Sequence, residues 1–277
     1  MNFDSPAEIR ALLEERGLAL KKRWGQNFLV NRGARQRLVE ILGPRPGETV
    51  WEIGPGLGSM TGMLAGTAAR LLAFEVDRGL CRFLEEDLRG HPTFTLVPGD
   101  FLDTWKETAR TQGPPDRILG NLPYSAASLM IADIIESGLR PIRMVFTVQR
   151  ELGDRMASAP GRKSYSSFSV LCQSCFTVID RGDLQPGSFY PVPDVVSSVV
   201  EMTAAAGAPA GEELKALSAI TRSLFASRRK TIRNNAKDPA VRDALEREGV
   251  DPGLRAEQLP PEVFVRLARR LTGSSAS

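Results

Sequence analysis

Residues 52–58 read Glu-Ile-Gly-Pro-Gly-Leu-Gly, and this stretch decides the fold. It begins inside a short apolar run at residues 49–53, which predicts a buried strand, and a helical pattern follows it. Glycines between a strand and a helix let a ligand approach closely, because they lack Cβ atoms and leave backbone N–H groups available. The dinucleotide fingerprint Gly-x-Gly-x-x-Gly has its last glycine where this chain has Ser59. The loop therefore favours a nucleotide-type ligand over a pyrophosphate, with a tight turn that binds nothing as the alternative.

Around this loop, short apolar runs alternate with helical patterns. The runs that predict strands lie at residues 49–53, 70–74, 93–97, 117–119 and 143–148. Their nearly continuous apolar character is typical of parallel strands buried on both faces, and their spacing fits repeated βαβ units. β-branched residues cluster again at 176–180 and 195–203, and we expect these two strands to close the sheet as a hairpin. The pattern predicts a doubly wound α/β sheet.

The two ends of the chain predict helices. Residues 5–8 form a capping box with proline at the first helical position, which predicts a short helix that ends at Gly17. Residues 204–211 have low complexity and no helical period, so we expect a linker there. Helical patterns follow at 212–225, 239–248 and 261–271. We therefore expect a sheet domain over residues 1–203, a linker over 204–211 and a small helical domain over 212–277.

Composition excludes several classes of protein. The chain has 277 residues, of which 42% are hydrophobic and 25% charged, so it is neither disordered nor collagen-like. No apolar run reaches the ~18 residues of a membrane span, and no basic leader begins the chain, so we expect a soluble cytoplasmic protein. Three cysteines and one histidine argue against a disulfide framework and a multi-histidine metal site. We interpret the lone Cys-x-x-Cys at 172–175 as part of a helix core.

Basic residues gather in two stretches that contain no acid, one between Glu15 and Glu40 and one between Glu213 and Asp238. Both can follow a phosphate backbone, and a solvated face is the alternative. The predicted phosphate contacts are Lys21, Lys22, Arg23, Arg222, Arg228, Arg229, Lys230 and Arg233.

Acidic residues stand at the ends of three predicted strands. Glu52, before the glycines, repels a diphosphate and suits an ammonium group such as that of a methionyl moiety. Glu75 lies about 20 residues beyond the glycines, where an acid accepts both hydroxyls of a ribose. We interpret Asp77 as the cap of the next helix. Asp100 can accept an adenine amino group with Phe101 beside the ring, and a bare turn is the alternative.

The sharpest signal is the tetrapeptide Asn-Leu-Pro-Tyr at residues 121–124, directly after the fourth predicted strand. Ligands of open α/β sheets bind at the carboxyl ends of the strands. The side-chain oxygen of Asn121 and the carbonyl of Leu122 can accept both N–H bonds of an exocyclic amine. Pro123 stiffens the turn, and Tyr124 can stack on a base. The tetrapeptide predicts a site for an amino-bearing base, with an ordinary turn as the alternative.

Taken together, these motifs resemble the ribosomal RNA adenine dimethyltransferase family, in particular its small-subunit (KsgA) type, over nearly the whole chain. Residues 22–29 resemble the family's N-terminal cofactor motif, residues 52–58 its glycine loop and residues 121–124 its catalytic tetrapeptide. Residues 188–191 resemble its late aromatic motif, and residues 228–234 the C-terminal segment of the small-subunit type.

The resemblance implies a class I (Rossmann-like) methyltransferase fold and S-adenosylmethionine as the cofactor. It implies transfer of methyl groups to N6 of two adjacent adenosines near the 3′ end of small-subunit (16S) ribosomal RNA in a pre-ribosomal particle, with a role in small-subunit biogenesis. No metal or membrane is implied, and we expect a monomer. The implied cofactor-binding residues are Gln26, Asn27, Leu29, Glu52, Gly54, Gly56, Glu75, Asp100, Phe101 and Asn121; the implied catalytic residues are Asn121, Leu122, Pro123, Tyr124 and Phe189, whose ring stacks on the flipped base.

The chain departs from the family pattern at three places. Asp194 and Val196 stand where the family usually has a lysine and an aspartate, and residues 166–167 are Ser-Ser where Gly-Arg is common. Three rival functions remain: a non-catalytic RNA-binding assembly or transcription factor, a nicotinamide-dependent dehydrogenase, and a large-subunit adenine methyltransferase. The intact tetrapeptide, the glycine spacing and the 228–234 segment argue against each in turn.

Overall fold

The structure is a computed structural model that describes residues 2–21 and 24–273, so the predicted RNA contacts Lys22 and Arg23 lie outside the described residues. The chain divides into two compact units, which are described separately. The first contains the residues up to 130 together with 141–150 and 180–202; the second contains 131–140, 151–179 and the residues from 203 onward.

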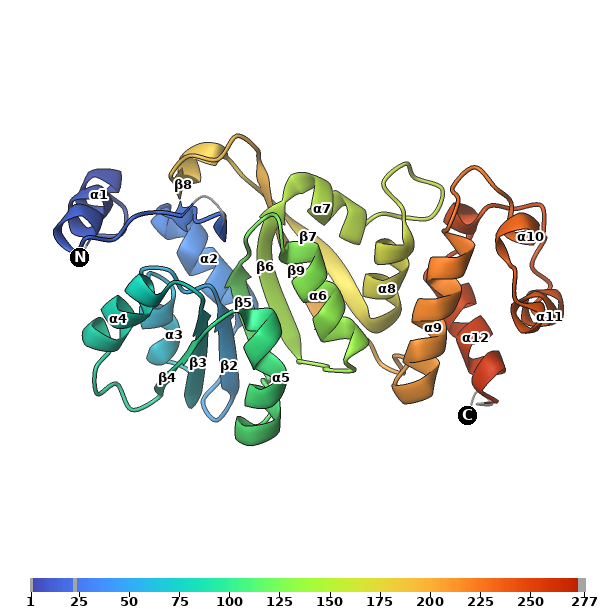
Figure 1. The fold of residues 1–277 in the computed structure, drawn as a ribbon, viewed down its shortest axis with the longest axis horizontal. Helices are drawn as coiled ribbons and strands as arrows, with labels where there is room; N and C mark the ends of the chain where they lie inside the picture. Colours follow the sequence, from blue (N-terminus) through green and yellow to red (C-terminus); the bar gives the residue numbers. More distant parts are fainter. Residues whose placement is uncertain (1, 22–23, 274–277) are drawn as a thin grey trace. The chain divides into compact units, whose positions relative to one another are not determined.

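A parallel sheet forms the centre of the first unit (Figure 1). Its strands are β2 (Thr49–Ile53), β3 (Arg70–Glu75), β4 (Phe94–Pro98), β5 (Arg117–Asn121) and β6 (Arg143–Gln149), followed by β7 (Phe176–Leu184) and β9 (Ser197–Ala204). The strand order is β4-β3-β2-β5-β6-β9-β7, and each neighbouring pair from β4 to β6 is parallel. The order reverses between β2 and β5, which makes their carboxyl ends the switch point where such sheets bind ligands. The predicted doubly wound sheet is confirmed; β9 lies between β6 and β7, and β7 is the edge strand on that side.

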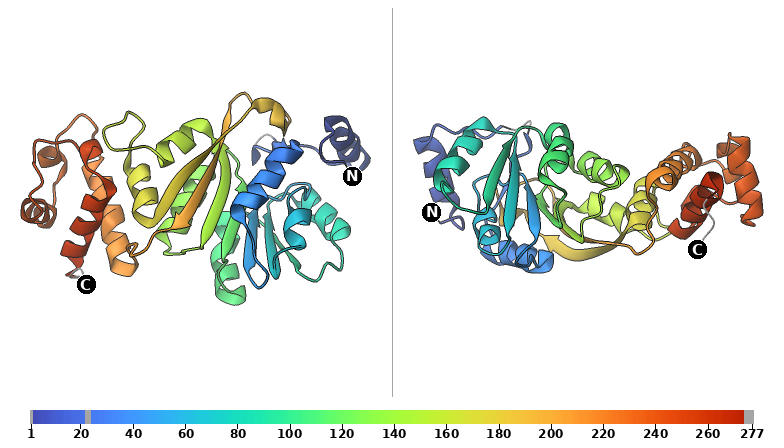
Figure 2. Two further views of the ribbon diagram at one scale, coloured as in Figure 1. Left: turned by 180° about the vertical axis from the view of Figure 1, so that it is seen from behind. Right: turned by 90° about the horizontal axis from the view of Figure 1, so that it is seen from below.

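Helices lie on both faces of this sheet (Figure 2). They include α2 (Arg32–Leu42), α3 (Thr61–Ala65), α4 (Arg78–Asp87) and α5 (Phe101–Gln112). Asp77 caps α4, because its Oδ1 atom accepts the N–H groups of Gly79 at 2.7 Å and Leu80 at 3.4 Å. Asp100 caps α5 by accepting the N–H of Leu102 at 3.0 Å. Both acids therefore begin a helix at the carboxyl end of a strand.

The N-terminal segment folds onto the same unit. Helix α1 (Pro6–Glu15) begins at the predicted cap, where the Glu8 N–H donates to Ser5 Oγ at 3.3 Å. Its buried side chains Ile9 and Leu13 pack against the apolar start of α4. Strand β1 (Phe28–Leu29) then pairs antiparallel with β8 (Phe189–Tyr190), a pairing the sequence pattern did not predict.

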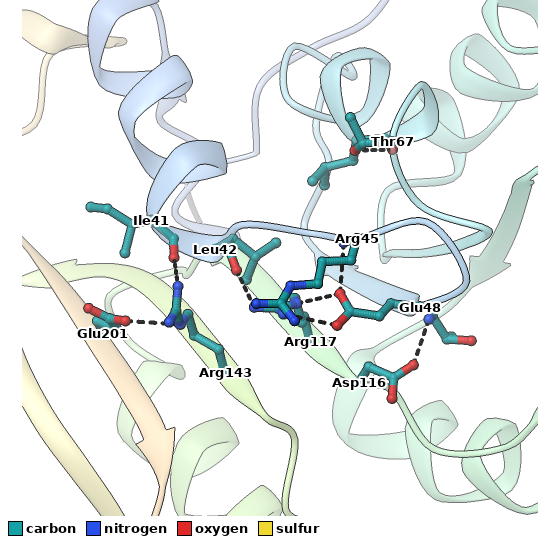
Figure 3. A network of polar contacts seen from close by, with 11 residues as sticks. Ile41, Leu42, Arg45, Glu48, Thr67, Asp116, Arg117, Arg143 and Glu201 are labelled. Atoms are coloured by element: carbon teal, nitrogen blue, oxygen red, sulfur yellow. Dashed lines mark hydrogen bonds and ion pairs between the residues drawn. The ribbon is translucent and has the colours of Figure 1, made fainter.

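A polar network at the amino ends of β5 and β6 holds the C-terminal end of α2 in place (Figure 3). The Arg117 guanidinium, 3% exposed, binds both carboxylate oxygens of Glu48 at 2.5 and 2.9 Å and donates to the Leu42 carbonyl at 2.6 Å. Arg143 donates to the Ile41 carbonyl at 2.6 Å. Both arginines thus satisfy carbonyls that a helix end leaves unpaired. The network holds α2 at the amino ends of β5 and β6.

The second unit is mostly helical. It contains α8 (Ser167–Cys175), α9 (Gly211–Leu224), α10 (Ile232–Asn235), α11 (Pro239–Arg247) and α12 (Pro261–Thr272), and α6 (Ala127–Glu136) and α7 (Arg150–Met156) contribute most of their residues to it. Helix α9 packs against α12 and α8, and Tyr165 donates a 2.9 Å hydrogen bond to the Leu259 carbonyl. Because α8 packs with the C-terminal helices, residues 151–179 group with them, although we expected the helical domain to begin only at 212. Cys172 and Cys175 are buried within α8.

Candidate active site

Nine of the ten predicted cofactor residues line one cavity at the carboxyl ends of β2, β3 and β5. They are Gln26, Asn27, Leu29, Gly54, Gly56, Glu75, Asp100, Phe101 and Asn121. The cavity therefore unites motifs that lie about 95 residues apart along the chain, as expected where parallel strands end side by side. Trp24 and Phe28, which belong to the predicted cofactor motif at residues 22–29, also line it, as do Met60, Ser125 and Met130, which the sequence pattern did not indicate.

The glycine loop requires its glycines for two reasons. Gly54, Gly56 and Gly58 have φ angles of +71°, +60° and +80°, which L side chains rarely adopt. A Cβ atom on Gly56 would lie 2.9 Å from Cε1 of Phe28. The loop thus turns sharply after β2 while the ring of Phe28 packs directly on its backbone.

Glu75 presents a carboxylate at the edge of the cavity. Its Oε2 accepts the Gly56 N–H at 3.1 Å, and its Oε1 accepts the Asp77 N–H at 2.9 Å. Each oxygen keeps a further lone pair, so the carboxylate can accept two hydroxyl groups of a ribose. Burial raises the pKa of Glu75 to about 7, an effect that the two backbone N–H groups partly offset.

Glu52 is not among the residues that line the cavity. Its side chain is fully buried below the glycine loop, and neither carboxylate oxygen has a hydrogen-bond partner among the described residues. Burial raises the pKa of Glu52 to about 7; the Thr61 hydroxyl lowers it, and the Glu75 carboxylate raises it further. The interpretation of Glu52 as a direct partner of a ligand ammonium therefore has no support from its position, because that carboxyl lies inside the protein.

Asp100 and Phe101 lie on the β4 side of the cavity. Asp100 is exposed, and its carboxylate also caps α5. Phe101 is buried and packs edge-on against Phe74, with ring centroids 5.1 Å apart. The aromatic packing fixes the wall beside which an adenine ring would lie, and the second oxygen of Asp100 can accept its amino group.

The tetrapeptide fixes the orientation of Asn121. The Asn121 Nδ2 atom donates to the Asn27 carbonyl at 2.7 Å. Because a carbonyl only accepts, the amide must turn its NH2 group toward Asn27, which leaves Oδ1 as an acceptor for a ligand amine. The Leu122 N–H donates to the Thr147 carbonyl at 3.1 Å, and the Leu122 side chain is buried. Backbone pairing with β6 thus anchors the turn.

Tyr124 and Phe189 differ in their surroundings. The Tyr124 hydroxyl lies 2.7 Å from Ser197 Oγ, and Tyr124 is half-buried next to the cavity-lining residues Pro123 and Ser125. Phe189 is 1% exposed and lies in the apolar core beside Leu29, its partner in the β1–β8 pair. It is not among the cavity-lining residues.

The predicted RNA contacts fall into three groups. In the first unit, Lys21 Nζ lies 3.2 Å from Asp77 Oδ2 and 4.2 Å from the centre of the Trp24 ring, so this cation is engaged within the protein. In the second unit, Arg222 pairs with Glu136 and Arg228 with Glu257. The remaining three, Arg229, Lys230 and Arg233, are exposed around the start of α10.

The described residues contain neither a metal-binding cluster nor a membrane-spanning helix. No cluster of three or more histidine, cysteine, aspartate or glutamate side chains suited to a metal ion occurs among residues 2–21 and 24–273. Within the same ranges, no helix is long and apolar enough to cross a membrane.

Comparison with known proteins gives the family. A family model described as ribosomal RNA adenine dimethylase matches residues 17–273. The chain belongs to this family. The ribosomal RNA small subunit methyltransferase A of Treponema pallidum is 40% identical over 280 residues, which cover 98% of this chain and 97% of the relative. The protein of the same name from Borreliella burgdorferi is 36% identical over 276 residues, with 98% and 95% covered.

Two solved structures share the fold of this chain. A dimethyladenosine transferase from Plasmodium falciparum has a TM-score of 0.76 at 20% identity, covering 86% of this chain and 94% of that one, which shows the shared fold. The 23S rRNA methyltransferase ErmE has a TM-score of 0.68 at 28% identity, covering 89% and 100%.

Within this ribosomal RNA adenine dimethylase, the departures from the family pattern have identifiable positions. Ser166 is the N-cap of α8, and its N–H donates to Ser169 Oγ at 3.0 Å. The Val196 carbonyl accepts the Arg150 N–H at 3.0 Å, while Asp194 is exposed in the loop before β9. None of these residues lines the cavity.

Proposed function

We propose that this dimethylase transfers methyl groups from S-adenosylmethionine to N6 of two adjacent adenosines near the 3′ end of small-subunit ribosomal RNA. The single observation that carries the proposal is the oriented amide of Asn121, held by the Asn27 carbonyl at 2.7 Å on the wall of the cavity. That geometry turns a fixed acceptor toward a ligand amine and suits a base with an exocyclic amino group.

The residues of the cavity fit the proposed cofactor. Glu75 offers two acceptors for a ribose, Phe101 and Asp100 form the wall for an adenine, and Gly54 and Gly56 leave room for close approach to the backbone. When bound, the cofactor supplies an electrophilic methyl group on a sulfonium. The residues of the chain position it, because the tetrapeptide and the glycine loop meet at the same sheet edge.

The tetrapeptide would prepare the amine for attack. The N6 lone pair of adenine is delocalised into the ring, so the amine is a weak nucleophile until its hydrogens are drawn out of plane. Asn121 Oδ1 and the Leu122 carbonyl would accept those two hydrogens and aim the lone pair at the methyl group. A new N–C bond forms as the sulfonium C–S bond breaks, and the surplus N6 proton leaves to water. Positioning and electrostatics account for the rate without a strong base.

A base stacked inside a helix cannot enter this cavity, so the target adenosine must be flipped out or unpaired. Tyr124 is the aromatic surface for the flipped base, and its ring is fixed by the contact between its hydroxyl and Ser197. For Phe189 to stack on the other face of the flipped base, the β1–β8 segment must shift, because the Phe189 ring is buried in the apolar core.

The exposed cations Arg229, Lys230 and Arg233 are proposed phosphate contacts to the same RNA. The substrate would be a pre-ribosomal small subunit in the cytoplasm, bound by a monomer. Support for the small-subunit substrate comes from the 228–234 segment and from the two relatives named as small subunit methyltransferases.

Asn121→Ala tests the proposal directly. Losing one preorganised acceptor should lower the single-turnover methylation rate on unmethylated small subunits by ~10²- to 10³-fold, with RNA affinity nearly unchanged. Both methylations should slow together, because both use the same acceptor. Ser128→Ala, a change on the neighbouring helix α6, is the matched control. An Asn121→Ala variant that keeps half the wild-type rate would refute the role, and mapping the methylated base by mass spectrometry would separate small-subunit from large-subunit RNA.

A further inference from the structure

A segment between α1 and α2 forms one wall of the cofactor cavity. We call its described residues, 18–21 and 24–27, the strap; residues 24–27 line the cavity directly. Among the described residues, the strap has a single turn at Trp24 and no strand, so contacts with the rest of the unit contribute to its position. Asp77 supplies two of these polar contacts, one to Lys21 and one to Gln26.

Asp77 is 4% exposed, and its two oxygens have different partners. Oδ1 accepts the Gly79 N–H at 2.7 Å and caps α4. Oδ2 lies 3.2 Å from Lys21 Nζ and 3.5 Å from Gln26 Nε2, both of which belong to the strap. One carboxylate therefore joins the rigid start of a helix to a segment that has little structure of its own.

The amide of Gln26 is engaged at both ends. Its Nε2 donates to Asp77, and its Oε1 accepts the Lys21 N–H at 2.9 Å. Leu18 lies against the same helix start, because a Cβ atom on Gly79 would come within 2.6 Å of Leu18 Cδ2. Gln26 thus ties the strap to itself and to Asp77, in addition to lining the cavity.

The strap also reaches the tetrapeptide. Its last residue, Asn27, is the one whose carbonyl accepts the Asn121 amide. A shift of the strap would therefore change the wall of the cofactor cavity and release the Asn121 amide at the same time.

We propose that Asp77 is a positioning residue that latches the strap over the cofactor cavity and, through Asn27, sets the orientation of the Asn121 amide. The inference rests on the proposed methyl transfer for its kinetic consequences. The latch itself is a property of the free protein, so it can be tested without cofactor or RNA.

Two variants break the latch from opposite sides. Asp77→Asn keeps an oxygen to cap α4 but replaces Oδ2 with an NH2 group that faces two donors. Gln26→Leu removes the strap's amide and leaves the cap intact, so it keeps the test valid if Asp77→Asn does not fold. Asp238→Asn is the matched control, because Asp238 caps α11 by accepting the Ala240 N–H at 2.8 Å.

The first measurement is acrylamide quenching of tryptophan fluorescence in the free protein. Trp51 and Trp105 are 0% and 3% exposed, so quenching reports mainly on Trp24, which lies in the strap. We expect stronger quenching in Asp77→Asn and Gln26→Leu than in the wild type and the control, with melting temperatures unchanged in Gln26→Leu. Equal quenching in all four proteins would overturn the latch.

The second measurement separates binding from turnover. S-adenosylmethionine should bind about tenfold more weakly to each latch variant, as expected for the loss of a charge-assisted hydrogen bond. At saturating cofactor the methylation rate should still be lower by ~3- to 10-fold, because the Asn121 amide is no longer held. The double variant should be no worse than either single variant. A role confined to capping α4 predicts that Gln26→Leu has no effect, and that result would also overturn the proposal. If the wild-type protein binds no S-adenosylmethionine, the proposed function fails while the quenching result still decides the latch.

Discussion

Glu52→Gln is expected to become progressively more stable relative to the wild type as the pH rises from 4.5 to above 7. The carboxyl is 0% exposed and has no hydrogen-bond partner among the described residues, and burial raises its pKa from its ordinary value of 4.5 to about 7. A group with a raised folded-state pKa favours the folded state fully below the unfolded pKa, and this contribution is lost as the pH rises through the folded pKa. The protein therefore bears the cost of ionising Glu52 above about pH 7.

The shift of roughly 2.5 pKa units corresponds to about 3 kcal/mol at the plateau, since one unit is worth about 1.4 kcal/mol. Glutamine has nearly the same shape and carries no charge at any pH. Relative to the wild type, Glu52→Gln should thus gain about 3 kcal/mol of unfolding free energy between pH 4.5 and pH 8.5. Burying the glutamine amide adds a free-energy cost that is the same at pH 4.5 and at pH 8.5, so this cost cancels when the two pH values are compared.

Urea unfolding at pH 4.5, 6, 7 and 8.5 and constant ionic strength measures the effect. Glu85→Gln, an exposed change on α4, is the control and should give a flat difference across this range. Parallel curves for Glu52→Gln and the wild type, with the same free-energy difference at every pH, would refute the reasoning. They would mean that the Glu52 pKa in the folded protein is close to its unfolded value.

Three further outcomes are expected. Glu75→Ala should weaken S-adenosylmethionine binding by tenfold or more in calorimetry, while RNA affinity stays unchanged. Burial raises the Glu75 pKa to about 7 and bound hydroxyls favour the carboxylate, so the affinity of the wild-type protein for S-adenosylmethionine should fall below pH 7 and binding should release protons. An affinity that does not depend on pH would exclude Glu75 from the site. Replacing Arg229 and Lys230 by glutamate should weaken RNA binding and leave cofactor affinity unchanged. The slope of the logarithm of the RNA binding constant against the logarithm of the salt concentration should become shallower by about 0.7 to 0.9 per lost phosphate contact. An unaltered slope would show that these two residues form a solvated face. Arg117→Met should cost ~1 to 3 kcal/mol in urea unfolding, because the Leu42 carbonyl loses its donor and the Glu48 carboxylate keeps only the Arg45 N–H, and no measurable loss would show that the network of Figure 3 is dispensable.

The parallel sheet could be predicted from the sequence because its signals are local. Continuous apolar runs, the glycine loop and the caps at Ser5 and Asp77 each act within a few residues. Nine cofactor candidates came together because they stand at strand ends, and the doubly wound topology places those ends at one edge.

Contacts between distant segments could not be predicted in the same way. Glu52 was interpreted as a ligand partner, but nothing in its local pattern reveals that β2 turns its carboxyl inward. The second role of Asp77 depends on Lys21 and Gln26, which lie more than 50 residues away. The grouping of α8 with the C-terminal helices is likewise a matter of tertiary packing, which no linker composition encodes.

The β1–β8 pair affects when, during synthesis of the chain, the cavity acquires the contacts that support its N-terminal border. Every residue that lines the cavity lies between positions 24 and 130, yet β1 is paired only by residues 189–190. A chain emerging from the ribosome would therefore possess all the cavity residues well before the strand that pins their edge. Fragments that end before residue 189 should contain the complete wall of the cavity, with its N-terminal border held by Asp77 but without the β1–β8 pairing. Ligand binding measured along a series of C-terminal truncations should thus rise only when β8 and the following sheet strand β9 are both present, rather than with the last cavity residue.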